Sequence, residues 1–129
     1  MNLILLLSSI VMGIIHLMWL FIIPNITSIP YFYASSFGII TSILNHGLTS
    51  DFLKYLDRVS LSLLVAYSLN IHYKYSLLYP FLFTTTGAVC YIAAKQTGDY
   101  RLHAMSHILA TANNFLILSH MAGLPSTKL

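Results

Sequence analysis

The sequence has no glutamate, and its only acidic residues are Asp51, Asp57 and Asp99. Charged residues make up 7% of the chain. In a soluble domain about a quarter of all residues are charged, and they cover its surface. The lysines and arginines form no cluster, which argues against a nucleic-acid-binding protein. The single cysteine, Cys90, excludes an intramolecular disulfide. This composition is typical of a chain whose solvent is lipid.

Apolar residues make up 57% of the 129 residues, and a transmembrane helix needs about 20 of them in a row. The sequence therefore predicts an all-α integral membrane helical bundle that forms a single transmembrane domain over residues 1–129. The first apolar run lacks a basic segment before it and a small-residue cleavage site, so we expect a retained helix rather than a signal peptide. Proline, glycine and polar residues divide the chain into five expected spans: about 2–23, 31–46, 55–73, 75–94 and 100–121.

Five spans place the N-terminus, the second-to-third loop and the fourth-to-fifth loop on one side of the membrane. Lys54, Arg58, Lys95 and Arg101 lie on that side. Because cytoplasmic loops carry the excess of basic residues, we expect a multi-pass protein whose N-terminus is cytoplasmic.

Histidines are unexpectedly frequent in so apolar a chain, and ionisable residues inside spans are costly and usually functional. His103 and His107 are four residues apart, so both imidazoles lie on one helix face, as two ligands of one metal would. His46 ends the second helix on the same side of the membrane and is the expected third ligand. Asp57, which we expect to open the third helix, and Ser42, one turn before His46, belong to the same layer.

The remaining polar residues of the spans favour structural roles. His16, His72 and His120 lie toward the opposite side, where we expect interfacial or hydrogen-bonded side chains and no metal ligands. Asn113 and Asn114 are expected to form hydrogen bonds between helices.

Two members of the proposed site have simpler interpretations when each is taken alone. Asp57 could cap the third helix or pair with Arg58 or Arg101. Ser42 could be a small packing residue that bonds to its own helix. Their combination with the three histidines favours a functional site.

That combination is Ser42-x-x-x-His46, then Asp57 eleven residues after the histidine, then His103-x-x-x-His107 in the last helix. It resembles the CREST superfamily of membrane hydrolases, which includes the progestin and adipoQ receptors, and looks most like the alkaline ceramidases. The resemblance implies Zn²⁺ on the three histidines, Asp57 beside the zinc-bound water and Ser42 near the reacting carbonyl. The chain departs from the family in having five expected spans instead of seven and no acidic calcium-binding N-terminal segment. A smaller bundle is also compatible with a homo-oligomer that closes the pocket.

The expected function is therefore zinc-dependent hydrolysis of a lipid amide, in ceramide or another N-acyl lipid, within the membrane. Three imidazoles leave one position of tetrahedral zinc open, as in catalytic sites. The alternative is a non-catalytic membrane receptor or lipid-binding protein with a structural zinc. A haem-binding electron carrier is disfavoured because His103 and His107 share one helix face. A channel or transporter subunit is disfavoured by the scarcity of acidic residues in the spans.

Overall fold

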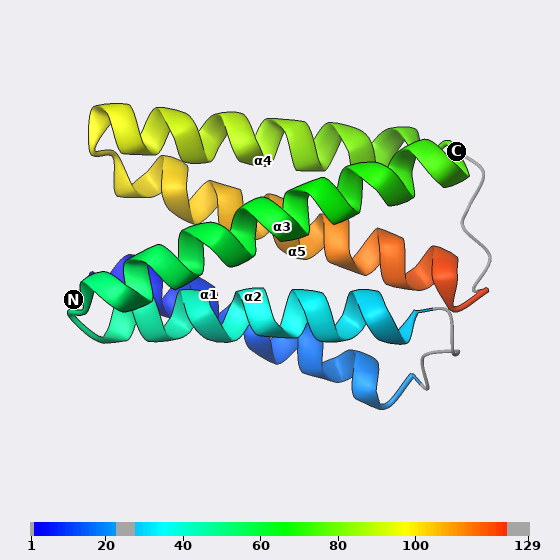
Figure 1. Cartoon of the computed structure of the whole chain (residues 1–129), viewed down its shortest axis with the longest axis horizontal. Coiled ribbons are helices and arrows are strands. Elements are labelled where there is room, and N and C mark those ends of the chain that lie inside the picture. The colour runs from blue at the N-terminus through cyan, green and yellow to red at the C-terminus, as the bar shows by residue number, and fades with distance from the viewer. Residues whose placement is uncertain (1, 23–27, 124–129) are drawn as a thin grey trace.

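The computed structural model describes residues 2–22 and 28–123, which form a bundle of α-helices with their long axes roughly aligned (Figure 1). The helices are α1 (Leu3–Leu17), α2 (Ile29–Gly47), α3 (Asp51–Tyr75), α4 (Leu78–Thr97) and α5 (Tyr100–Met121). A single 3₁₀ turn, η1 (Met18–Leu20), continues α1. The five predicted helices are thus confirmed, with α5 at its predicted bounds.

Local sequence signals set the helix ends. The side chains of Asn2, Ser50 and Asp99 cap α1, α3 and α5 by accepting hydrogen bonds from backbone amides of the first turns. Ser76 and Gly98 end α3 and α4 in the left-handed conformation, with φ of 53° and 73°. These local signals set the starts of α1, α3 and α5 and the ends of α3 and α4.

Several predicted boundaries differ from the structure. α3 begins at Asp51 rather than near residue 55, because Ser50 caps it, and α4 spans 78–97 rather than 75–94. The α-helical part of the first helix ends at Leu17, and its predicted end at Ile23 lies outside the described residues. Because α3 starts early, Asp57 lies in its second turn and does not open the helix. The interpretation of Asp57 as a cap is therefore wrong.

The order of the helices in space brings the N-terminal part of α1, the α2–α3 connection and the α4–α5 connection to one end of the bundle (Figure 1). α5 packs most extensively on α4 and also lies against α1, while α2 lies between α1 and α3. The packing of α3 on α4 is sparser than that of α2 on α3. The polar residues predicted for one layer are thus carried to the same end.

The interior is polar and the exterior is apolar. Buried polar side chains outnumber buried apolar ones, and a compact apolar cluster, which includes Trp19, Tyr31 and Ile117, occupies only the end near η1. Large apolar side chains instead cover the outside, for example Leu63 at 66% exposure and Val89 at 64%. Among the described residues, one helical stretch, Leu3–Leu20, is both long and apolar enough to cross a membrane. The other four helices contain polar or charged side chains that lower the mean hydropathy, some of them buried, such as Ser60 and His107, and some exposed, such as Lys54 and Lys95.

Candidate metal centre

The three histidines predicted as ligands meet at the end of the bundle that holds the α2–α3 and α4–α5 connections. His46 comes from the last turn of α2, and His103 and His107 come from the first two turns of α5. All three are buried, and one ring nitrogen from each lies within 4.8 Å of the others. Ligand nitrogens around tetrahedral zinc lie roughly 3.3 Å apart, a difference that rotation of the imidazoles can close. The geometry is that of a site able to bind a metal ion.

An unsatisfied nitrogen supports this interpretation. Nε2 of His46 is buried and has no hydrogen-bond partner among the described residues. An unpaired buried polar atom costs about 1–3 kcal/mol, so such an atom normally has a partner. The rings of His103 and His107 lie around it, with centroids 5.0 and 5.5 Å from that of His46. A cation in the middle of the group would satisfy the free nitrogen.

A serine of α1 fixes the orientation of His107. Ser8 Oγ lies 2.7 Å from His107 Nδ1 and 3.0 Å from the carbonyl oxygen of Leu5. The hydroxyl has one hydrogen, so only one of these two contacts can use it. When that hydrogen goes to Leu5, Nδ1 of His107 carries a proton and donates to Ser8, and Nε2 keeps a free lone pair. This is the arrangement by which outer hydrogen bonds prepare a histidine for a metal.

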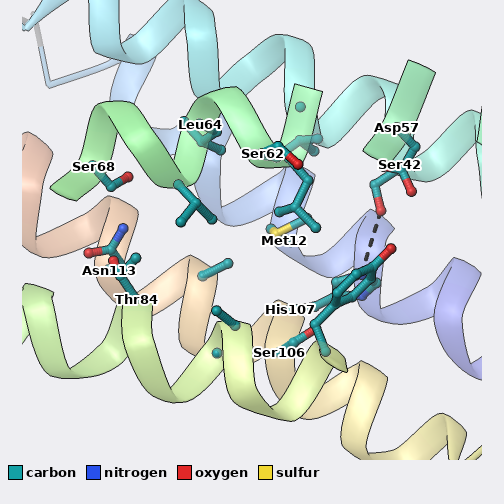
Figure 2. A pocket seen from close by; sticks show the side chains of 18 of the residues that line it. Met12, Ser42, Asp57, Ser62, Leu64, Ser68, Thr84, Ser106, His107 and Asn113 are labelled. Carbon is teal, nitrogen blue, oxygen red and sulfur yellow. Dashed lines mark hydrogen bonds between the residues drawn. The ribbon is translucent and has the colours of Figure 1, made fainter. Parts of the chain in front are cut away.

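Ser42 and Asp57 lie beside the histidines, as the sequence predicts. Ser42 Oγ is 3.5 Å from Nε2 of His107, and Figure 2 shows it with Asp57 at the same end of a cavity. Both side chains are buried. Asp57 Oδ2 accepts a hydrogen bond of 2.7 Å from the amide of Asn45. In the described part of the chain Asp57 makes no ion pair, so the predicted alternative of pairing with an arginine does not hold.

A cavity of about 820 Å³ extends from this site along the bundle (Figure 2). His103, His107, Ser42 and Asp57 line one end, and Asn113 lies toward the other. Its walls between these ends are mainly apolar side chains of α3 and α4: Leu61, Leu64, Val65, Phe83, Ala88 and Ile92. The sequence predicted the polar end but not the cavity, which depends on how the helices are spaced.

The other histidines lie apart from this group. The Nδ1 atoms of His16 and His72 are, like Nε2 of His46, buried without a hydrogen-bond partner among the described residues, but no second imidazole lies beside them in a group of close ligand atoms. Nε2 of His16 lies 2.9 Å from Ser36 Oγ, and Nε2 of His72 lies 2.9 Å from Thr84 Oγ1. The ring of His120 stacks edge-on against Tyr75. These three lie outside the group of close ligand atoms.

The predicted hydrogen bonds of the two asparagines between helices are confirmed. The hydroxyl of Tyr31 on α2 donates to Asn114 at 2.6 Å and accepts from Asn113 at 3.3 Å. This network joins α2 to α5 at the end of the cavity away from the three histidines.

The comparisons with protein-family models, with curated proteins and with solved structures found no match to this chain. The function of the site therefore has to be inferred from its own residues.

Proposed function

We propose that this protein is a multi-pass membrane hydrolase that uses zinc at His46, His103 and His107 to cleave the amide bond of an N-acyl lipid. The observation that carries the proposal is the unpartnered Nε2 of His46, buried among two further imidazoles. The residues that the resemblance to alkaline ceramidases assigns to catalysis, Ser42 and Asp57, line the cavity that starts at this group.

The surface supports a membrane location for the whole bundle. Exposed large apolar side chains occur on all five helices, for example Ile14, Ile40, Leu63, Val89 and Ile108, each at 55% exposure or more. An exposed apolar surface of this extent is unfavourable in water. α1 also contributes Ser8 to the site, which supports a resident first helix.

The chemistry follows from the donor set and its neighbours. Zinc bound by three imidazoles supplies a Lewis acid that lowers the pKa of a water and polarises a carbonyl. Asp57 can accept the proton of the attacking water and return it to the leaving amine. Its bond from Asn45 holds one carboxylate oxygen and leaves the other free for this transfer. The hydroxyl of Ser42 can donate to the carbonyl oxygen as negative charge develops there.

The cavity suits the acyl part of the substrate. Its volume of about 820 Å³ lies within the range of ligand pockets. The sparse packing between α3 and α4 favours entry of the lipid from the side, directly from the bilayer.

The test measures zinc content and hydrolysis in the same purified samples, with ceramides and simple N-acyl lipids of several chain lengths. We expect about one zinc per chain, loss of zinc in His103→Ala, and full zinc in the control His72→Ala. Asp57→Asn should keep zinc and lose about 10²–10⁴-fold in rate, as expected for a lost general base. Asp51→Asn, the same change at an exposed residue that lines neither cavity, should leave the rate unchanged.

The outcomes separate the two functions predicted from the sequence. Zinc without turnover of any N-acyl lipid in the wild type would favour the receptor or lipid-binding alternative. An active wild type with an equally active Asp57→Asn variant would preserve the hydrolase and refute the role of Asp57. Unchanged zinc in His103→Ala would refute the ligand assignment.

A further inference from the structure

A second, smaller hollow lies on the outer side of the three histidines. It has a volume of about 330 Å³. His46 and His103 form part of its wall, and His103, Arg58 and Lys95 line both this hollow and the large cavity. The candidate metal centre thus lies between a mainly apolar cavity on one side and a polar hollow on the other. The further polar residues of the outer hollow are Asn2, Asn45, Thr49, Lys54, Asp99 and Tyr100.

Of its three cations, Lys54 is already neutralised. Its ammonium lies 2.8 Å from Asp51 Oδ1, in an exposed pair within the first turn of α3. The same hydrogen bond lowers the pKa of Asp51 from its ordinary value. Lys54 therefore brings little net charge to the hollow.

Arg58 and Lys95 are different. They project from α3 and α4, and their charges repel each other. In the described residues neither side chain has a carboxylate within ion-pair distance. Asp57 is close enough to attract both, but it lines the large cavity and not this hollow, and it lies beyond ion-pair distance of either cation. Lys95 instead lies over the ring of Tyr91, 5.2 Å from its centroid.

The described wall of the hollow has one acid. Asp99 caps α5, where its Oδ1 accepts a hydrogen bond of 2.8 Å from the amide of Arg101, and it offsets one of the two charges. Arg58 and Lys95 thus leave an excess of one positive charge over Asp99 on the walls of the hollow, and a metal ion at the histidines would increase it.

We propose that the outer hollow binds the phosphate of a lipid head group, so that the substrate is an N-acyl lipid that carries a phosphate monoester. The inference rests on the proposed function, because the amide must lie at the histidines while the acyl chain fills the large cavity. The remaining part of the lipid then extends into the outer hollow. Arginine offers a planar pair of donors that matches phosphate oxygens, and lysine adds a point charge.

The experiment compares the binding of N-palmitoyl ethanolamine and of its phosphate monoester to the zinc-loaded protein in detergent. We expect the phosphate ester to bind about tenfold more tightly or better, as one charge-assisted hydrogen bond would give. Arg58→Gln and Lys95→Gln should each reduce this preference several-fold. Arg101→Gln is the matched control, because Arg101 is exposed at the same end of the bundle and lines neither hollow.

Each other result would overturn the inference. Equal affinity for the two lipids would exclude a phosphate site. An equal loss in Arg101→Gln would show a general effect of surface charge. A further outcome is that inorganic phosphate displaces the phosphate ester at the concentration at which that ester binds. In that case the ligand of the hollow would be free phosphate and not a lipid head group.

Hydrolysis assayed in parallel keeps the two proposals apart. Cleavage of N-palmitoyl ethanolamine without preference for its phosphate ester would refute the phosphate site alone. Tight binding of the phosphate ester without cleavage of either lipid would refute the proposed hydrolysis and leave the phosphate site standing.

Discussion

Replacing Ser8 by alanine should weaken zinc binding although Ser8 is not a ligand. Its hydroxyl lies 2.7 Å from Nδ1 of His107 and can accept a hydrogen bond from that nitrogen while its own hydrogen goes to Leu5. This bond fixes the protonated nitrogen on the outer side of the ring and leaves Nε2 free for the metal. Without it, the imidazole can rotate or take the other tautomer, in which Nε2 carries the proton and cannot bind zinc.

The magnitude follows from the kind of contact that is lost. Loss of an outer hydrogen bond to a metal-bound histidine typically lowers metal affinity 10–100-fold, which corresponds to about 1.4–2.7 kcal/mol. The neighbouring Ser9 offers a matched control. Its hydroxyl lies 3.5 Å from the same nitrogen and donates to the carbonyl of Leu5 at 2.9 Å. Ser9→Ala should therefore change zinc affinity by less than about threefold.

Zinc affinity can be measured by competition with a chromophoric chelator in detergent, with helix content followed by circular dichroism. Ser8→Thr should retain most of the affinity, because it keeps the hydroxyl. Wild-type affinity in Ser8→Ala would refute the assignment of the proton to Nδ1. An equal loss in Ser9→Ala would show that packing of α1 against α5 matters and the hydrogen bond does not.

Two further predictions concern the fold. The first uses single cysteines in a Cys90→Ser background. A thiol reagent that does not cross the membrane should label Thr49→Cys and Gln96→Cys from the cytoplasmic side and Lys74→Cys from the other side. Labelling of the first two variants from opposite sides would contradict the five-span topology. The second is that Gly87→Val should destabilise the bundle by about 1–3 kcal/mol, as overpacking does. A Cβ added at Gly87 would already lie 3.4 Å from the Cβ of Leu109, where α4 meets α5, and valine adds two further methyl groups. An unchanged melting temperature would contradict this prediction.

The sequence was sufficient to predict which histidines come together. His103 and His107 share a face because helices repeat every 3.6 residues. Successive helices run in opposite directions, so the end of the second helix and the start of the fifth lie at the same end of the bundle, which brings His46 to the other two. Neither step needs any knowledge of the side-chain packing. The structure confirms this grouping, with the three ligand nitrogens within 4.8 Å of each other. The identity of the metal and the reaction remain predictions from the resemblance.

The features that sequence reasoning missed depend on contacts between helices. Ser8 lies in an apolar run, where a serine is ordinarily a small packing residue, and only the packing of α1 on α5 brings it to His107. Arg58 and Lys95 were read as flanking charges, and only the approach of α3 and α4 places them on one hollow. The start of α3 at Asp51 is different in kind, because it follows from a local signal, the side chain of Ser50 that caps the helix.

The contrast between one strongly apolar helix and five expected spans has a physical explanation. Mean hydropathy averages all faces of a helix, whereas lipid contacts only the outer face. In the middle of α3, Ser60 and Ser68 are buried while Leu63 is 66% exposed. The charged residues that also lower the mean, such as Lys54 and Lys74, are exposed near the two ends of the helix. A soluble bundle would show the reverse arrangement, with the leucine inside and the serines in water. The proposed membrane location of α2–α5 therefore rests on their exposed apolar side chains and not on their mean hydropathy, by which only Leu3–Leu20 among the described residues is apolar enough to cross a membrane.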